Sequence, residues 1–213
     1  MLAMVLLLLG LQAPERVQLL FASDFYHDQI TAHTGETWYG LFPHSRGWEL
    51  APTRIHVAPV NSGCMENGWR VTVDRPPHPL FLVRGATLLR AGQLTTVATT
   101  GIGLTPPTSQ DFRFGQSAFR FVALGGDTSY TLRLVRLLDG RSQDLVSYHG
   151  RWQIAWPPKI LWIGDLDRDG KPDFFADVHM FEIPPADWVL YLSSAAGPNE
   201  LVHRVAEFQS VVC

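Results

Sequence analysis

The sequence is a succession of short apolar segments separated by turns rich in glycine and proline, and this pattern runs from residue 38 onward. The segment at residues 69–73 alternates apolar and polar side chains with the period of two that a half-buried strand requires. The dipeptide Asp139-Gly140 predicts a tight hairpin between two such segments. The predicted strands lie at residues 55–60, 69–73, 80–83, 93–100, 118–124, 130–137, 145–148, 152–156, 160–163, 174–178 and 188–192. About ten to twelve strands at a spacing of about 8–12 residues predict an all-β fold, either a sandwich or an irregular propeller-like sheet.

Two segments interrupt the pattern. Residues 101–116 have the composition of a loop with adjacent prolines, and residues 101–117 are where a domain boundary would fall if the chain had one. Residues 200–208 place apolar side chains at helical spacing, although a terminal strand fits nearly as well. No linker is long enough to separate two domains, so we expect residues 23–213 to form a single β-rich domain.

One short segment, the loop at residues 165–173, carries a high concentration of carboxylates. Aspartates alternate at positions 165, 167 and 169, a glycine follows, and a further aspartate stands at position 173. Ca²⁺ takes six to eight oxygen ligands at about 2.3–2.6 Å, and a loop that curls around the ion brings alternating side chains together. Gly170 permits the turn that returns the chain to the ion. The predicted ligands are Asp165, Asp167, Asp169, Asp173 and the backbone carbonyl of Lys171.

The flanks of this segment predict strands and not the helices of an EF-hand. Residues 160–163 and 174–176 are rich in aromatic and β-branched side chains. The twelfth position counted from Asp165 is Ala176, where an EF-hand has a bidentate glutamate. The alternative is a solvated acidic turn that binds no metal, because aspartate and glycine are also common turn residues.

With these flanks the segment resembles the calcium loop of FG-GAP/VCBS-type repeats, the integrin-like strand–loop–strand with the pattern Asp-x-Asp-x-Asp-Gly-x-x-Asp. The matching residues are Asp165, Asp167, Asp169, Gly170 and Asp173, preceded by the family's typical Gly-Asp step at Gly164-Asp165. The resemblance implies a Ca²⁺ site on a β scaffold. In that family the repeats usually recur and build propeller blades, whereas this sequence holds one copy of the motif.

The first residues have the character of a secretory leader. Residues 2–11 form an apolar run with the length of a signal-peptide core, shorter than the roughly 20 residues that span a bilayer. Ala13 and Ala22 are candidate cleavage positions, and we place the predicted signal peptide at residues 1–22. The alternative is a buried N-terminal strand or helix. No other stretch of the sequence is long enough to cross a membrane.

The sequence contains two cysteines, Cys64 and Cys213. In an oxidising compartment the simplest expectation is a disulfide between them. It would close a loop of about 150 residues and stabilise the fold by roughly 4–5 kcal/mol in chain-entropy models. Two unpaired thiols are the alternative. The leader and the cysteines together predict a periplasmic or secreted protein.

The net charge and the motifs of the sequence limit the classes of function and partner that we expect. The formal net charge is −3 and the sequence has no lysine or arginine cluster, so nucleic acid is not an expected partner. None of the eight histidines has a zinc spacing, and neither a serine-hydrolase elbow nor a phosphate loop occurs. Residues 24–36 gather acids and histidines that either line an acid–base site or form a solvated loop. Most of the seven tryptophans are core candidates.

We therefore expect a non-catalytic, calcium-stabilised extracytoplasmic protein that binds a protein or glycan partner. Its size, its leader-like start and its lack of a catalytic motif are similar in kind to bacterial periplasmic inhibitors and immunity-type proteins that carry such a loop. The alternative is a secreted hydrolase acting on glycans or cell wall through carboxylates that leave no local sequence pattern.

Overall fold

The computed structural model of the chain describes residues 16–26, 28–62, 65–86, 89–97, 101–126, 128–150, 156–179 and 186–210. These residues form strands, turns and loops, and no helix occurs among them. The predicted all-β fold class is therefore confirmed. The predicted tight hairpin is also present, because the segments on either side of Asp139-Gly140 pair antiparallel.

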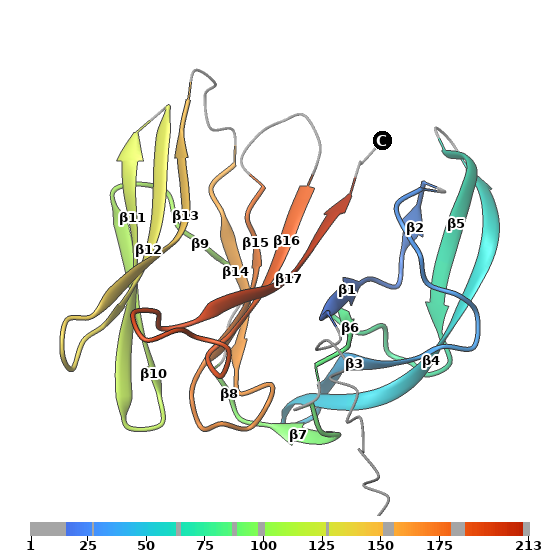
Figure 1. Cartoon of the computed structure of the whole chain (residues 1–213), viewed down its shortest axis with the longest axis horizontal. Coiled ribbons are helices and arrows are strands. Elements are labelled where there is room, and N and C mark those ends of the chain that lie inside the picture. The colour runs from blue at the N-terminus through green and yellow to red at the C-terminus, as the bar shows by residue number, and fades with distance from the viewer. Residues whose placement is uncertain are drawn as a thin grey trace, which may run out of the picture.

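The strands build three sheets that lie side by side as layers (Figure 1). The first sheet, in the order β1-β6-β3-β4-β5-β2 with β7 paired to β4, consists of β1 (Gln18–Leu20), β2 (Asp24–Phe25), β3 (Thr37–His44), β4 (Gly47–Ser62), β5 (Met65–Val73), β6 (Leu82–Arg84) and β7 (Gly92–Leu94). The central sheet, in the order β17-β16-β15-β14-β8 with β9 paired to β14, consists of β8 (Thr96–Val97), β9 (Ile102–Gly103), β14 (Lys159–Gly164), β15 (Asp173–Asp177), β16 (Ala186–Leu192) and β17 (His203–Ser210). The outer sheet, in the order β10-β11-β12-β13, consists of β10 (Thr108–Phe114), β11 (Ser117–Gly126), β12 (Ser129–Arg136) and β13 (Ser142–His149).

The central sheet is buried on both faces. In β15, Phe174 packs against the outer sheet, with its ring centroid 5.3 Å from that of Phe121. The next residue, Phe175, packs against the first sheet, with its ring centroid 4.7 Å from that of Phe81. Successive side chains of a strand point to opposite faces, so these neighbours belong to two different cores. This explains why the central strands are continuous apolar runs in the sequence, as strands covered on both sides are.

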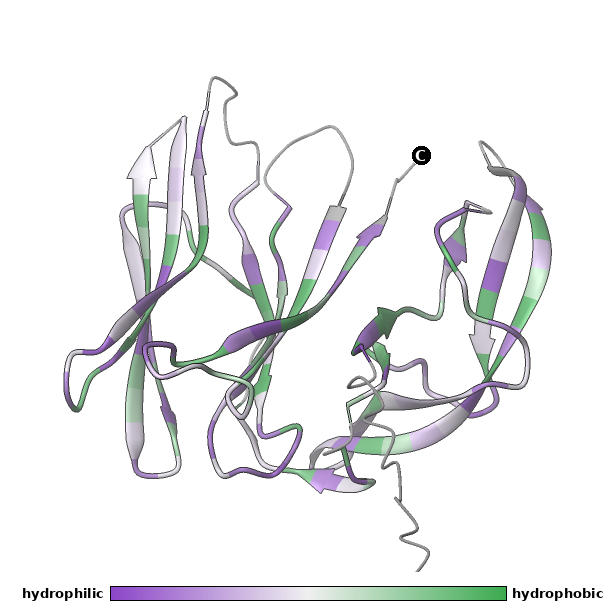
Figure 2. Cartoon of the chain, in the orientation of Figure 1, coloured by the Kyte–Doolittle hydropathy of each residue, from purple (hydrophilic) through white to green (hydrophobic). Residues whose placement is uncertain are grey.

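The outer sheet covers the central sheet with one face only. Its inward positions include the buried Phe119, Phe121 and Leu134. On its other face, ion pairs cross between neighbouring strands, as between Arg133 and Asp144 at 2.6 Å. Figure 2 shows hydrophobic stretches along the strands and hydrophilic residues in many of the connections. Along β11 and β12, which lie over the strands predicted at residues 118–124 and 130–137, buried positions alternate with more exposed ones because the sheet has this single buried face.

The structure corrects the prediction for residues 101–116. This segment contains β9 and β10, not a continuous loop. In β10 only Phe112 and Phe114 are buried, and the residues between and before them are exposed. Pairing with β11 supplies the hydrogen bonds that hold this mostly polar strand. For the C-terminal segment the strand alternative is correct, since β17 pairs with β16 along its whole length.

Several predictions fall on residues outside the described ranges. Both cysteines, Cys64 and Cys213, belong to this group, as does most of the strand predicted at residues 152–156. Within the predicted leader, residues 18–20 form β1, and Leu19 and Leu20 are buried in the core between the first and central sheets. Cleavage after Ala13 would leave this strand in the mature chain, whereas cleavage after Ala22 would remove it.

Candidate metal centre

The acidic segment forms the loop between β14 and β15. The loop is closed by the strand ladder, because Gly164 at the end of β14 is opposite Asp173 at the start of β15. Within the loop, Arg168 and Gly170 have left-handed backbone conformations, with φ of 66° and 82°. Glycine adopts this conformation without a steric penalty, as expected at Gly170, whereas arginine does so rarely. These two residues curl the chain back toward the ends of the strands.

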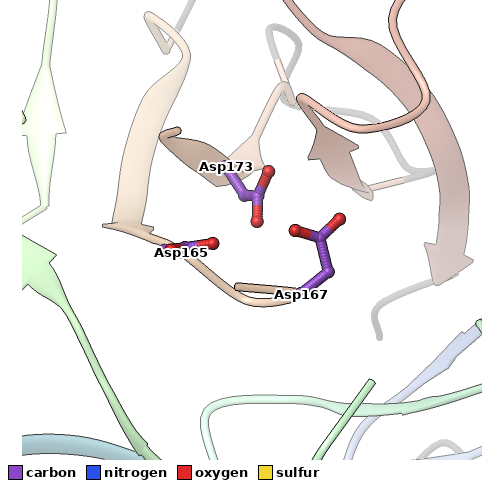
Figure 3. A group of neighbouring side chains, drawn as sticks. All are labelled: Asp165, Asp167 and Asp173. Carbon is purple, nitrogen blue, oxygen red and sulfur yellow. The ribbon is translucent and has the colours of Figure 1, made fainter. Parts of the chain in front are cut away.

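Three of the predicted carboxylates converge inside this loop (Figure 3). Asp165, Asp167 and Asp173 each place one oxygen within 4.8 Å of the other two. Their exposed fractions are 9%, 9% and 0%. Three acids packed this closely away from water repel one another unless protons or a cation balance their charge. The group is therefore a buried acidic triad that could hold a metal ion.

Asp173 lies deepest and accepts hydrogen bonds on both oxygens. Its Oδ2 accepts the backbone N–H of Leu166 at 2.7 Å. Its Oδ1 accepts the backbone N–H of Ser193 at 2.8 Å and the hydroxyl of Ser193 at 3.0 Å. Burial, together with the negative charge of Asp167, raises the pKa of Asp173 to about 8 in the metal-free protein. These hydrogen bonds orient the carboxylate, but the loss of solvent has the larger effect on its charge.

Asp165 has one carboxylate oxygen that the protein leaves unsatisfied. Its Oδ2 accepts the backbone N–H of Gly170 at 3.0 Å. Its Oδ1 is buried and has no hydrogen-bond partner among the described residues. Burial, and then the charges of Asp169 and Asp167, raise its pKa. A buried oxygen without a partner, on one of three carboxylates that lie close together, is the arrangement that a bound cation satisfies.

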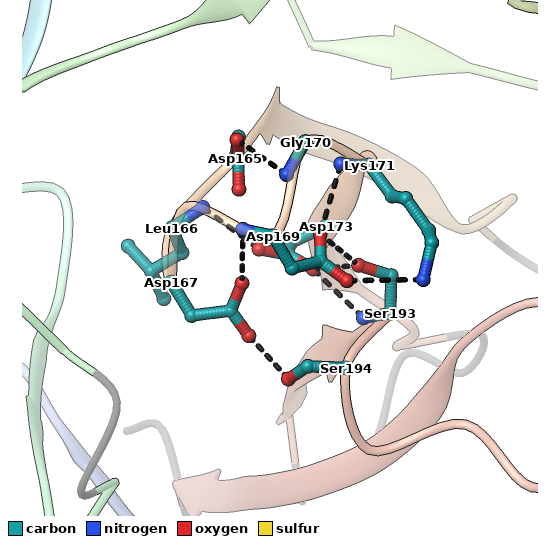
Figure 4. Close-up of polar contacts among 9 residues, drawn as sticks. All are labelled: Asp165, Leu166, Asp167, Asp169, Gly170, Lys171, Asp173, Ser193 and Ser194. Atoms are coloured by element: carbon teal, nitrogen blue, oxygen red, sulfur yellow. Dashed lines mark hydrogen bonds and ion pairs between the residues drawn. The ribbon is translucent and has the colours of Figure 1, made fainter.

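Asp167 is held by a second serine. The hydroxyl of Ser194 donates to its Oδ2, and the backbone N–H of Asp169 lies 3.3 Å from its Oδ1 (Figure 4). Ser193 and Ser194 follow β16, and the strand pairing places them beside the loop. Sequence reasoning missed this pair, because no local signal links residues 193–194 to an acidic loop some 20 positions earlier.

Asp169 and Lys171, the other predicted ligands, lie beside the triad. The Asp169 carboxylate accepts the backbone N–H of Lys171 at 2.8 Å, and the Lys171 ammonium is 3.4 Å from its second oxygen. The hydroxyl of Ser193 lies 3.1 Å from the same Asp169 oxygen that the Lys171 N–H contacts. Ser193 thus links Asp169 to Asp173. Ligation by Asp169 and by the Lys171 carbonyl stays a prediction.

The loop also contacts the chain where it passes from the first sheet to the central sheet. The Arg168 guanidinium donates to the carbonyl of Ala91 at 3.0 Å, and the N–H of Asp165 donates to the carbonyl of Thr95 at 2.9 Å. A Cβ at Gly92 would come within 2.6 Å of Arg168 Nη2, so the guanidinium lies directly against the backbone. Order in the loop is therefore coupled to order at the junction between two sheets.

In the polar early segment at residues 24–36, the other candidate site, Asp24 and Glu36 are engaged in ion pairs. Asp24 accepts two hydrogen bonds of 2.7 Å from the Arg70 guanidinium, which lower its pKa. Glu36 lies 2.7 Å from the Arg84 guanidinium and accepts the Trp38 indole N–H at 3.1 Å. Both carboxylates therefore have structural roles in the first sheet.

Comparison of the chain with protein-family models, with curated proteins and with solved structures found no match. Within the described part of the chain there is no helical segment with the length and hydrophobicity needed to cross a bilayer. The functional conclusion therefore rests on the site itself.

Proposed function

We propose that this protein is a non-catalytic, calcium-stabilised extracytoplasmic protein that binds a macromolecular partner, and that the Asp165–Asp173 loop holds the ion. The observation that carries the proposal is the buried, unpartnered Oδ1 of Asp165 beside the carboxylates of Asp167 and Asp173. Burying three neighbouring carboxylates is unfavourable unless protons or a cation compensate their charge.

The donor set favours Ca²⁺ over other metals. All donor atoms of the triad are carboxylate oxygens, which suit hard cations such as Ca²⁺, Mg²⁺ and Mn²⁺ better than zinc or copper. Mg²⁺ demands near-ideal octahedral geometry and usually keeps several waters, whereas Ca²⁺ accepts an irregular shell with more protein oxygens. Asp169 and the Lys171 carbonyl would complete that shell, in keeping with the resemblance to the FG-GAP/VCBS-type calcium loop.

In this proposal the ion is structural. It neutralises acids that come from the end of β14, from the loop and from the start of β15, and through Ser193 and Ser194 it also fixes the connection after β16. A site that joins several elements reduces the conformational freedom of the surface around it. Less conformational entropy is then lost when a partner binds. A bacterial periplasmic inhibitor or immunity-type protein is the form we favour.

Calcium binding is tested by titrating metal-stripped protein with Ca²⁺ and, separately, with Mg²⁺ in a calorimeter. We expect one Ca²⁺ per chain and a higher melting temperature, since a ligand at 100 times its Kd stabilises the folded state by about 2.7 kcal/mol. Asp167→Ala should abolish both effects. Asp144→Ala, which removes an exposed aspartate of the outer sheet, is the control. Absence of heat with Ca²⁺ in the wild-type protein would refute the site.

The partner is sought by capture from a cell-envelope extract on immobilised protein, with Ca²⁺ or with EDTA. We expect calcium-dependent capture of a discrete partner. The competing activity is hydrolysis of a cell-wall or polysaccharide substrate. Calcium-dependent turnover that is lost on replacing a surface carboxylate, with no captured partner, would replace this proposal with the hydrolase.

A further inference from the structure

The outer sheet has one exposed edge, at β10, that no other strand of the described residues covers. β10 is the first strand in the order β10-β11-β12-β13 (Figure 1), and its only partner strand there is β11. This pairing runs without a register shift from Thr108 to Phe114, and every residue of β10 except its two phenylalanines is exposed. A regular, exposed strand edge of this kind is a template on which a further strand can pair.

The backbone groups of Ser109, Asp111 and Arg113 point away from β11. Phe114 and Ser117 flank a two-residue turn, so they form the hydrogen-bonded pair that closes the hairpin. Hydrogen-bonded and non-hydrogen-bonded pairs alternate along an antiparallel ladder, which directs the N–H and C=O groups of every second residue outward. In agreement, the outward carbonyl of Asp111 accepts a side-chain amide of its own strand at 3.1 Å. The edge therefore offers donors and acceptors to a neighbouring strand.

The opposite edge of the outer sheet, β13, is protected by contacts within the chain. Its register with β12 shifts between Leu132 and Arg133, which leaves Leu145 as an extra residue in a bulge. The carbonyl of Leu145 accepts the Tyr191 hydroxyl at 3.0 Å, so a residue of the central sheet covers part of this backbone. Bulges and covered edges are common protections against further strand pairing. β10 has neither protection among the described residues, so it is the edge at which the outer sheet can be extended.

The charges of β10 complement a second, antiparallel copy of the same strand. With a twofold axis at Phe112, Asp111 of each copy lies opposite Arg113 of the other, whereas an axis at Asp111 would bring two aspartates together. Arg113 has no ion pair among the described residues, so its guanidinium is available to the other copy. Asp111 already accepts two hydrogen bonds from Arg120, at 2.5 and 2.8 Å. Because each carboxylate oxygen has two acceptor sites, Asp111 can accept a second guanidinium without losing the first.

We propose that β10 pairs antiparallel with β10 of a second copy of this chain, so that two outer sheets join into one continuous sheet. The outward backbone groups supply the hydrogen bonds, and the two pairs of Asp111 with Arg113 set the register. A contact between two short strands is smaller than a standard stable interface, so we expect association only at about 100 µM and above. This inference goes beyond the proposed function and does not depend on a bound metal ion.

The test is the oligomeric state of the protein in solution, measured by sedimentation equilibrium from about 10 µM to about 1 mM. We expect the wild-type protein to be in equilibrium between monomer and dimer. Arg113→Asp places like charges at both pairs and should weaken association at least about tenfold. Arg46→Asp, the same change of charge at an exposed residue of the turn between β3 and β4, is the matched control and should leave association unchanged. Both variants should keep the wild-type melting temperature at the lowest concentration.

A second variant tests the register of the two strands. Asp111→Lys alone should also weaken association, because both copies then carry only cations at positions 111 and 113. An equimolar mixture of Asp111→Lys with Arg113→Asp should restore the dimer, since each aspartate then lies opposite a cation. A wild-type protein that stays monomeric at about 1 mM would overturn the proposal. A dimer that Arg113→Asp leaves intact, or that the mixture of variants does not restore, would also overturn it.

Discussion

Ser193 donates both its backbone N–H and its hydroxyl to a single oxygen of Asp173, at 2.8 and 3.0 Å, although the two residues are 20 positions apart. The same hydroxyl lies 3.1 Å from an oxygen of Asp169. One small side chain from the end of β16 therefore orients two of the predicted metal ligands. Residues that orient ligands in this way affect metal affinity although they do not touch the ion.

Replacement of Ser193 by alanine should accordingly weaken Ca²⁺ binding. The backbone N–H still reaches Asp173, so we expect a loss of about tenfold and not a complete loss. Calorimetric titration of metal-stripped Ser193→Ala measures the effect, with Ser109→Ala, a change at an exposed serine of β10, as the control. An affinity equal to that of the wild-type protein would show that the hydroxyl does not support the site.

Arg168→Asn should loosen the metal loop from the junction between the first and central sheets. Asparagine tolerates the left-handed backbone of this position, so the change removes mainly the bond to the Ala91 carbonyl. We expect the free energy of unfolding to fall by about 1 kcal/mol. Urea denaturation measures it, and Arg113→Asn, at an exposed arginine of β10, should have no comparable effect. Equal stability of the two variants would contradict the coupling.

The metal-free protein should become less stable as the pH rises. The pKa of Asp173 is raised from its ordinary value of 3.8 to about 8. Between these values the folded state holds a proton that the unfolded state has released, so stability decreases from about pH 4 to about pH 8. Ca²⁺ should oppose this trend because it binds the deprotonated carboxylates. Melting curves in EDTA and in Ca²⁺ between about pH 5 and pH 8 measure both effects, and a melting temperature in EDTA that rises over this range would be inconsistent with the buried triad.

Phe174→Ala and Phe175→Ala should damage different cores. Both phenylalanines are fully buried, and truncation of such a side chain costs about 3–5 kcal/mol. Hydrogen exchange should increase mainly in β10–β12 for Phe174→Ala, and in β3 and β6 for Phe175→Ala. The paired variants are each other's control. The same exchange pattern in both would mean that the two cores do not respond separately.

The predicted bridge between Cys64 and Cys213 is testable by mass spectrometry of unreduced peptides. In protein exported to an oxidising compartment, we expect a single linked peptide pair. Mutation of either cysteine to serine should remove that pair and leave one thiol that can be alkylated. Two alkylatable thiols in native wild-type protein would exclude the bridge and weaken the argument for export.

The sequence by itself determined the features that depend on neighbouring residues. The strands predicted at residues 118–124 and 130–137 are present as β11 and β12, and both have one buried face. The convergence of Asp165, Asp167 and Asp173 follows from nine consecutive positions that contain a turning glycine. The mostly polar β10 was missed, since a strand held by pairing with β11 needs few apolar residues of its own.

Only the tertiary structure decided which distant residues of the chain these features contact. Strand pairing brought Ser193 to Asp173, and the passage between sheets brought Ala91 to Arg168, over separations that leave no periodic signal. The burial of adjacent phenylalanines in two separate cores requires a sheet covered on both faces, and one strand's sequence does not specify what covers each face. The physical reason is that side-chain direction is set by local backbone geometry, whereas contacts between distant segments are set by the packing of whole sheets.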